Sequence, residues 1–359
     1  MNTAVTSTQP VASAGVTTRA HGGNDVWGQP EAEFSSNANA CGPCPQALRH
    51  IQQADSGRYP EPGYVSLRQR LASFHGVDSN RILIAASGSE FIVRITALAS
   101  MQIGITGSGS CVSKPSVWIP PQAYADYAQA AAAYQLQRAD SPEQASLVWC
   151  CDPSSPLGLH DTHLPDAIAS AANPRSAWVV LDRAYEPLRL HGSLPVGESA
   201  LDVLWQLWTP NKALGLPGIR AAYAIAPVHA IALARQAEQL AASWLLGAHG
   251  LAMLEAWVTP SVQVWVQESL PVLREWKAQQ VALCTALGFE CMPSHANFFT
   301  ARLPGDDQTD ALIQRVARLR GLGVKLREAS SFGLPGHARL SVQPPAAQNA
   351  LRKAWLATA

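Results

Sequence analysis

The sequence is poor in charged residues and lacks a long uninterrupted apolar segment. Charged side chains make up 14% of its 359 residues and hydrophobic ones 47%, a balance typical of compact globular proteins and not of disordered chains. The 26 basic and 26 acidic residues cancel, and no Lys/Arg cluster is present, so nucleic acid and anionic membranes are not expected as partners. No apolar run reaches about 18 residues, which argues against a membrane-spanning helix.

The N-terminus and the cysteines give no sign of secretion. Residues 1–20 lack a basic start followed by a continuous apolar segment, so they do not resemble a secretory signal. The seven cysteines are odd in number and scattered along the chain, a pattern that fits reduced thiols better than a disulfide framework. We therefore expect a cytoplasmic protein with a flexible N-terminal tail.

The tetrapeptide Cys41-Gly-Pro-Cys44 allows two interpretations. It matches the thioredoxin-type redox motif, which should follow a core strand and open a helix. Here a segment rich in Asn, Ser and Ala precedes it, so the start of a helix at Pro45 is the favoured interpretation.

The alternation of short apolar strands with helices in the first half predicts an open α/β sheet. Strands are expected at residues 81–86, 117–119, 147–151, 178–181 and 203–207. Polar clusters follow these strands, and open parallel sheets bind ligands at the carboxyl ends of their strands. The turn Ser87-Gly88-Ser89 would offer backbone N–H groups and the positive end of a helix dipole to a phosphate, although many α/β proteins contain such a turn.

The second half predicts a smaller α+β unit. Long helices are expected at residues 228–239, 248–258 and 261–287, followed by strands near 289–292, 297–302, 324–327 and 339–342 and a final helix from residue 346. A chain of 359 residues is long for one hydrophobic core, so we expect two domains. The expected division is an N-terminal tail and active-site arm (1–45), a large domain (46–250) and a small C-terminal domain (251–359).

Lys212 lies in an apolar, glycine-containing stretch between residues 208 and 223. Burying an ammonium group beside Leu214 and Leu216 costs free energy, so a neutral, nucleophilic amine is expected. Such amines form Schiff bases with carbonyls, and proteins most often use this chemistry to hold pyridoxal phosphate. Arg220 offers a cation for a phosphate eight residues later. The alternative is a surface lysine in a Gly/Pro-rich turn.

Motifs along nearly the whole chain resemble those of fold-type I pyridoxal-phosphate enzymes of the class I/II aminotransferase superfamily. They include the Lys212 loop with its two glycines and Arg220, and the segment Asp182-Arg-Ala-Tyr185 just past an expected strand. The resemblance implies an α/β fold in which a large domain has a mostly parallel seven-stranded sheet between helices, plus a smaller α+β C-terminal domain. It also implies pyridoxal 5'-phosphate as cofactor, bound covalently by Lys212.

The resemblance implies roles for further residues at the cofactor. Asp182 would face the ring nitrogen, where a carboxylate makes the ring an electron sink, Tyr185 would face the ring hydroxyl, and Tyr124 would stack on the ring. The residues implied at the cofactor phosphate and ring hydroxyl are Ser87, Gly88, Ser89, Thr209, Arg220 and Ser155. Tyr59 resembles the tyrosine that reaches the cofactor phosphate of the neighbouring subunit, which implies a homodimer with shared active sites.

Two arginines and the N-terminal arm are implied in substrate binding. Arg339 resembles the arginine that clamps the substrate α-carboxylate; the alternative is an ordinary strand-edge arginine. His21-Gly-Gly-Asn24, followed by Asn37 in a Phe-Ser-x-Asn-x-Asn context, resembles the threonine-phosphate decarboxylases of cobalamin biosynthesis, near relatives of histidinol-phosphate aminotransferases. Arg327 is similar in placement to the second arginine of these enzymes and, with His21 and Asn37, would hold a substrate phosphate.

Four positions depart from the superfamily pattern. Asp152 and Ser155 replace the asparagines of the usual Asn-Pro-x-Asn-Pro-x-Gly loop, and Ser155 has a shorter reach to the ring hydroxyl. Arg183 replaces a usual glutamate. Asn211 replaces the serine that commonly precedes the lysine, which leaves Thr209 to serve the phosphate.

These features together predict an enzyme that acts on a phosphorylated amino acid. The favoured reaction is decarboxylation of a substrate resembling L-threonine O-3-phosphate, with the bond to be broken selected by orientation. If the Cα–H bond is oriented instead, Lys212 moves the proton and the protein is an aminotransferase of the histidinol-phosphate type. A non-catalytic protein of the same fold is the third hypothesis. His160 and His163 are interpreted as part of a solvated loop, so no metal site is expected.

Overall fold

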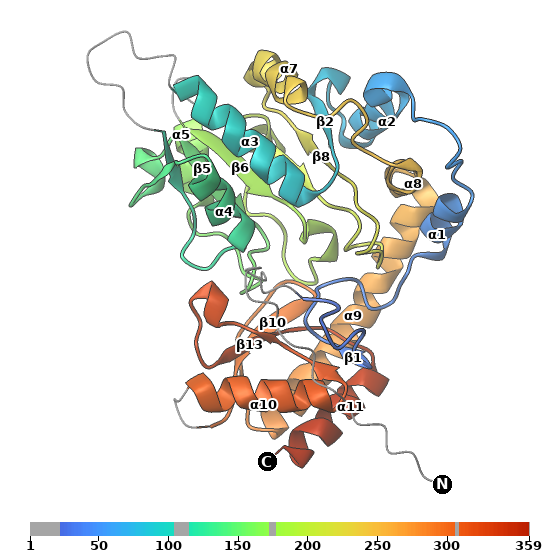
Figure 1. Cartoon of the computed structure of the whole chain (residues 1–359), viewed down its shortest axis with the longest axis vertical. Coiled ribbons are helices and arrows are strands. Elements are labelled where there is room, and N and C mark those ends of the chain that lie inside the picture. The colour runs from blue at the N-terminus through green and yellow to red at the C-terminus, as the bar shows by residue number, and fades with distance from the viewer. Residues whose placement is uncertain (1–21, 104–114, 172–176, 306–308, 359) are drawn as a thin grey trace.

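A seven-stranded, mostly parallel sheet forms the centre of the larger part of the protein (Figure 1). The computed structural model describes residues 22–103, 115–171, 177–305 and 309–358. The strands, in their order across the sheet, are β2 (Ile82–Ala85), β8 (Ala222–Ile225), β7 (Trp205–Trp208), β6 (Trp178–Asp182), β5 (Leu147–Cys151), β3 (Ser116–Trp118) and β4 (Gln137–Arg138). β8 runs antiparallel to both of its neighbours, and the other pairs are parallel. The predicted α/β architecture is confirmed.

Helices cover both faces of this sheet. One face carries α3 (Gly88–Ile103), α4 (Ala125–Ala133) and α7 (Ile231–Gln239), and the other carries α1 (Pro45–Gln52), α2 (Val65–His75), α5 (Leu164–Ala171) and α8 (Ala248–Trp257). The short helix α6 (Glu198–Leu201) precedes β7. Alternate residues of β2 enter different cores, Ile82 and Ile84 on one face and Leu83 and Ala85 on the other. Burial on both faces explains the near-continuous apolar runs that predict these strands.

The C-terminal part forms a smaller α+β unit. β12 (Arg327–Glu328), β13 (His337–Ser341), β10 (Phe298–Arg302) and β9 (Glu290–Cys291) make an antiparallel sheet, and β1 (Ala32–Glu33) pairs in parallel with β11 (Val324–Lys325). Its core also contains residues of α10 (Thr309–Gly321) and α11 (Pro345–Ala357). The 27-residue helix α9 (Pro260–Ala286) joins the two parts, because Val262 packs in the core of the large sheet and Cys284 in the core of the small unit. The domain division at residues 250 and 251 stays a prediction.

The sequence patterns miss several elements, among them β1, β4, β8, α5, α6 and α10. β1 and β4 have two residues each and α6 has four, so none of them is long enough to show a periodicity. β8 has the same length as the predicted β2 and β7, and it follows the Lys212 loop directly. α5 and α10 are regular helices of 8 and 13 residues that the sequence analysis does not identify. Among the described helices, none is long and apolar enough to span a bilayer.

The Cys41–Cys44 segment leads into a helix, as the favoured interpretation predicts. α1 begins at Pro45, with Cys44 at its N-cap position. Burial raises the pKa of the Cys41 thiol to about 11 and also raises the pKa of Cys44. Because a redox-active cysteine needs a lowered thiol pKa, the structure argues against the redox interpretation.

Candidate active site

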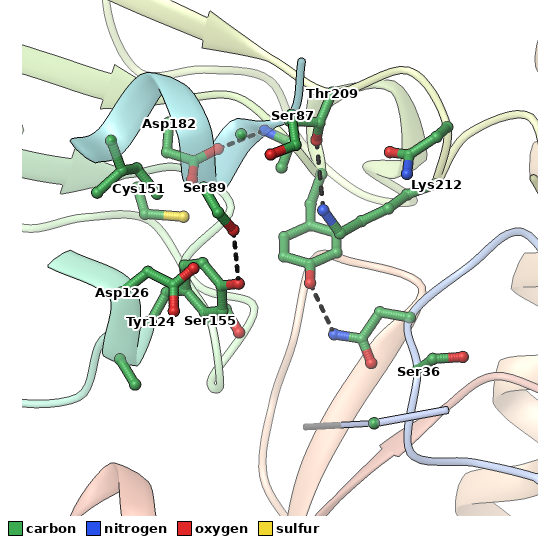
Figure 2. Close-up of a pocket in the computed structure, with 18 of the residues that line it drawn as sticks. Ser36, Ser87, Ser89, Tyr124, Asp126, Cys151, Ser155, Asp182, Thr209 and Lys212 are labelled. Atoms are coloured by element: carbon green, nitrogen blue, oxygen red, sulfur yellow. Dashed lines mark hydrogen bonds between the residues drawn. The ribbon is translucent and has the colours of Figure 1, made fainter. Parts of the chain in front are cut away.

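A cavity of about 410 Å³ lies where the carboxyl ends of β5, β6 and β7 meet the small unit. Most residues that the sequence predicts for the site line it, namely Asn37, Ser87, Gly88, Ser89, Tyr124, Ser155, Asp182, Tyr185, Thr209, Lys212, Arg220, Arg327 and Arg339. In Figure 2, Lys212 points toward Thr209 and Ser89 points toward Tyr124. His21 lies outside the described residues, and Tyr59 does not line this cavity.

Lys212 follows β7 in a loop that the N-terminal arm holds in place. Its Nζ atom donates a hydrogen bond to Thr209 Oγ1 at 3.3 Å and lies 5.3 Å from the centre of the Tyr185 ring. The backbone N–H of Asn39 donates to the Lys212 carbonyl at 2.8 Å. Gly215 has a φ of +65°, and a Cβ atom there would lie 3.0 Å from the Asn39 carbonyl oxygen, so this loop requires glycine.

Asp182 is the last residue of β6, and its carboxylate is buried. Oδ2 accepts a hydrogen bond from the Tyr127 hydroxyl at 2.7 Å, and Oδ1 accepts one from the Ala184 backbone N–H at 2.9 Å. Burial raises the pKa of Asp182, while the Tyr127 hydrogen bond and the charge of Lys212 act in the opposite direction. A carboxylate fixed in this way can hold a proton on the ring nitrogen of pyridoxal phosphate.

Tyr127 is a site residue that the sequence patterns do not identify. It lies on α4, is fully buried, and stacks its ring on Trp149 with the ring centroids 4.3 Å apart. Burial raises the pKa of Tyr127 well above its usual value, so the hydroxyl remains a donor to Asp182. The spacing Tyr124-x-x-Tyr127 is the available signal, because Tyr124 is the N-cap residue of α4 and its carbonyl accepts a hydrogen bond from the Tyr127 N–H at 3.2 Å.

We expect Tyr127→Phe to lower the free energy of unfolding of the cofactor-free protein by about 1–3 kcal/mol, because it removes a donor from the buried Asp182 carboxylate. Urea denaturation measures this difference. Tyr134→Phe, at the exposed end of the same helix, is the matched control and should change stability by less than about 0.5 kcal/mol. Equal stability of Tyr127→Phe and wild type would contradict the role given to this hydrogen bond.

The N-terminus of α3 forms a seat for an anion. The backbone N–H groups of Ser87, Gly88 and Ser89 donate to no other described residue, and the helix dipole favours negative charge there. A Cβ atom on Gly88 would lie 2.9 Å from Thr209 Cγ2, so glycine permits this close approach. Arg220 lines the cavity, and its side chain makes no hydrogen bond or ion pair to the described part of the chain. This seat fits the phosphate of pyridoxal phosphate.

Tyr124 stands beside the anion seat. Its hydroxyl lies 3.2 Å from Ser89 Oγ, and its ring meets the ring of Tyr127 edge-on at 5.9 Å between centroids. The aromatic wall that this arrangement gives the cavity is compatible with the predicted stacking of Tyr124 on the cofactor ring.

Arg327 and Arg339 form a basic end of the cavity. They lie directly opposite each other on β12 and β13, with their guanidinium carbons 4.6 and 5.5 Å from the centre of the Phe332 ring. Burial, followed by the charge of Arg339, lowers the pKa of Arg327 to about 10. Like charges at directly opposed positions repel each other, so this end of the cavity favours an anionic ligand.

Arg339 is buried and is held on two sides. Its Nη2 atom donates to the Ser35 carbonyl at 2.9 Å, and its Nη1 atom donates to Ser155 Oγ at 3.0 Å. Arg339 is therefore not an ordinary exposed arginine at a strand edge. Because the Ser155 hydroxyl accepts this bond, its own proton remains available to donate to a ring hydroxyl.

The N-terminal arm reaches the cavity, whereas Tyr59 lies outside it. Gly22 and Asn37 line the cavity, and Asn37 Nδ2 donates to the Tyr185 hydroxyl at 3.3 Å. Tyr59 is 78% exposed, stacks on Trp244 at 4.5 Å between centroids, and borders a second cavity that shares Arg220 with the first. Tyr59 therefore does not line the candidate site of its own chain, and its role at a neighbouring subunit's cofactor stays a prediction.

Asp152 anchors the loop after β5 and does not line the cavity. It is fully buried, and its carboxylate accepts a hydrogen bond from Arg189 Nη2 at 2.5 Å and lies 3.2 Å from His160 Nδ1. His163 instead packs against the Trp118 ring at 4.7 Å between centroids. The two histidines have different partners, and the described residues hold no group of three potential metal ligands.

Arg183 and Asn211 also have structural partners. The Arg183 guanidinium lies 4.3 Å from the centre of the Trp208 ring and donates to Gln206 Oε1 at 3.0 Å. Asn211 Nδ2 donates to the Ile219 carbonyl at 3.3 Å, which fixes the turn between Lys212 and Arg220. The two replacements thus support the loops around the site.

Comparison with known sequences identifies the family. Residues 31–354 match the family described as aminotransferase class I and II. The chain belongs to this family. It is 28% identical over 338 residues to the histidinol-phosphate aminotransferase of Jannaschia sp. (strain CCS1), and the alignment covers 87% of each chain.

Solved structures of the same fold include two proteins with different reactions. The L-threonine-O-3-phosphate decarboxylase of Porphyromonas gingivalis has a TM-score of 0.72 at 22% identity, with 90% of this chain and 98% of that chain covered. The histidinol-phosphate aminotransferase of Sinorhizobium meliloti, in complex with pyridoxal-5'-phosphate, has a TM-score of 0.74 at 22% identity, with 92% of each chain covered. The family match and this fold confirm the prediction of a fold-type I pyridoxal-phosphate enzyme.

Proposed function

We propose that the protein is a pyridoxal-phosphate-dependent decarboxylase of a phosphorylated amino acid resembling L-threonine O-3-phosphate. The observation that carries this proposal is the pair Arg327 and Arg339, buried in one cavity with Lys212. A substrate with a carboxylate and a phosphate offers one anion to each guanidinium group. The shared fold with the P. gingivalis L-threonine-O-3-phosphate decarboxylase supports the proposal, which includes a place in cobalamin biosynthesis.

The residues around the cofactor position have separate tasks in this proposal. Pyridoxal phosphate, when bound, supplies an electron sink for the carbanion at the substrate Cα. Lys212 holds the cofactor covalently, and Asp182 retains the proton on its ring nitrogen. Arg220 and the N-terminus of α3 bind its phosphate.

The residues at the basic end select the bond that breaks. Arg339 holds the substrate carboxylate from a position fixed by Ser35 and Ser155, so the bond between Cα and the carboxylate takes the orientation for cleavage. Arg327 holds the substrate phosphate. Lys212 Nζ, beside Thr209, then returns a proton to Cα.

Amino-group transfer is the second candidate reaction. The similarity to the Jannaschia histidinol-phosphate aminotransferase across 87% of each chain favours it. In this reaction Lys212 Nζ removes the Cα proton, and the two arginines hold the phosphate of one substrate and the carboxylates of the other.

Product analysis of the purified protein tests the two reactions directly. The protein is supplied with pyridoxal phosphate and either L-threonine O-3-phosphate alone or histidinol phosphate with 2-oxoglutarate. Stoichiometric release of CO2 from threonine phosphate supports the decarboxylase. Formation of an oxo product and glutamate without CO2 overturns it in favour of the aminotransferase.

We expect Arg327→Gln to raise the KM for L-threonine O-3-phosphate by about 10-fold or more, because a hydrogen bond to a charged group contributes about 1.5–3 kcal/mol. The KM for L-threonine, which has no phosphate, should change much less. Steady-state kinetics on both substrates measure the difference, and Arg318→Gln, at an exposed position of α10, is the control. Equal effects on the two substrates would contradict a phosphate role for Arg327.

The proposal extends to a cytoplasmic homodimer with shared active sites. The exposed pair Tyr59 and Trp244 borders the cavity that shares Arg220 with the candidate site, which supports the approach of a second subunit to the cofactor phosphate. The six cysteines of the described residues are free thiols, in keeping with a reducing compartment.

A further inference from the structure

Asn37 and Tyr185 make a hydrogen bond whose direction matters for the site. Asn37 Nδ2 donates to the Tyr185 hydroxyl oxygen at 3.3 Å, and both residues line the cavity. An amide N–H can only donate, so this contact occupies a lone pair of the tyrosine oxygen and leaves the hydroxyl proton unused. Within the described part of the chain that proton has no acceptor. It is therefore available to a ligand in the cavity.

The backbone of Asn37 and the ring of Tyr185 are held in place by the surrounding structure. The carbonyl of Asn37 accepts a hydrogen bond from Asn297 Nδ2 at 3.2 Å, and Asn297 is fully buried. Asn39 Nδ2 donates to the Ala213 carbonyl at 3.0 Å, which ties the arm to the Lys212 loop. The Tyr185 ring packs edge-on against Phe298 at 4.8 Å between centroids. These contacts fix the Asn37 backbone and the Tyr185 ring, and Asn37 Oδ1 is buried with no hydrogen-bond partner among the described residues.

We propose that Asn37 is a positioning residue that turns the Tyr185 hydroxyl proton toward the ring oxygen of the cofactor. This inference rests on the proposed function, because it needs pyridoxal phosphate linked to Lys212. A donated hydrogen bond stabilises negative charge on the ring oxygen, so that oxygen attracts the proton on the linked lysine nitrogen less strongly. Asn37 would therefore act on the pKa of this linkage through Tyr185, without touching the reacting atoms.

This role is compatible with the predicted role of Asn37 in the substrate-phosphate pocket. The amide has two N–H groups, and the contact with Tyr185 uses one of them. Substrate binding and the protonation of the lysine linkage can therefore be measured separately, the first as a KM and the second as a spectroscopic pKa without substrate.

The test uses wild type, Asn37→Asp, Tyr185→Phe and the double variant, each loaded with pyridoxal phosphate. A pH titration of the visible absorption without substrate reports the pKa of the lysine linkage. Tyr185→Phe should raise this pKa by about 1 to 2, the equivalent of one hydrogen bond to a charged group. Asn37→Asp should raise it by a similar amount, because an aspartate can only accept and takes the Tyr185 proton for itself.

The double variant separates this route from a simple charge effect. If Asn37 acts through Tyr185, Asn37→Asp adds little once Tyr185 is replaced by phenylalanine. An equal shift in both backgrounds, or no shift in Asn37→Asp, overturns the inference. Gln53→Glu, at an exposed position after α1, controls for the added charge and should leave the titration unchanged.

Two further outcomes are distinguishable. If Asn37→Asp does not bind the cofactor, Asn37→Ala replaces it in the test. Asn37→Ala alone should raise the pKa of the lysine linkage by less than Tyr185→Phe does. When Asn37→Ala is added to Tyr185→Phe, this pKa should not change further. If wild type shows no visible absorption with pyridoxal phosphate, the proposed function itself fails. If wild type shows the absorption and the variants do not follow the pattern, the role of Asn37 alone fails.

Discussion

Lys212→Ala is expected to abolish the visible absorption of lysine-linked pyridoxal phosphate and to slow turnover by about 10²–10⁴-fold or more. The variant loses the amine that holds the cofactor and moves the proton, and no second lysine lines the described cavity. Cofactor binding itself should survive in weaker form, because the anion seat at α3 and Arg220 do not depend on Lys212. Absorption spectra and equilibrium dialysis with pyridoxal phosphate measure the two effects separately.

Lys353→Ala is the matched control for this experiment. Lys353 is exposed on α11 and lies outside the cavity. Its replacement should change neither the absorption nor the turnover. Unchanged visible absorption in Lys212→Ala would rule out Lys212 as the attachment point and, with it, the chemistry proposed for the site.

Strand-end reasoning predicts one part of the site, whereas residues such as Asn37, Arg327 and Arg339 are predicted only through the resemblance to the family. Asp182 ends β6 and Thr209 follows β7, and the carboxyl ends of neighbouring parallel strands meet at one edge of the sheet. Short motifs therefore locate these residues before any packing is known. The same reasoning predicts the cavity, because the Lys212 loop leaves that edge.

The contacts that the sequence does not predict depend on packing between distant segments. The hydrogen bond from Tyr127 to Asp182 spans 55 positions and depends on how α4 lies on the sheet. The buried pair Asp152 and Arg189 is 37 positions apart. Neither separation follows from helix or strand periodicity, so no local pattern reveals these partners. The replacement of an asparagine by Asp152 becomes understandable once Arg189 is seen to bind it.

Asp182→Asn is expected to reduce turnover by about 100-fold or more while leaving the cofactor-free protein at least as stable as wild type. An asparagine can keep both buried contacts, accepting from the Ala184 N–H through Oδ1 and donating to the Tyr127 oxygen through Nδ2. It cannot hold the proton on the ring nitrogen as a carboxylate does, so the ring becomes a weaker electron sink. Steady-state turnover measures the first effect, and thermal unfolding with and without pyridoxal phosphate measures the second.

The pH dependence of stability distinguishes this explanation from simple damage to the fold. Because burial raises the folded-state pKa of Asp182 above its ordinary 3.8, folding favours the protonated carboxyl group. Asp182 therefore contributes most to the free energy of unfolding below pH 3.8, and this contribution is lost as the pH rises through the folded-state pKa of Asp182. Asp182→Asn has no group that titrates here, so the free energy of unfolding of the cofactor-free variant should fall less than that of wild type over the same pH range.

Adding pyridoxal phosphate at neutral pH should raise the free energy of unfolding of wild type, because the ring nitrogen pairs with the Asp182 carboxylate. The increase should be smaller for Asp182→Asn. A variant that is less stable than wild type without cofactor at neutral pH would show instead that Asp182 serves the fold.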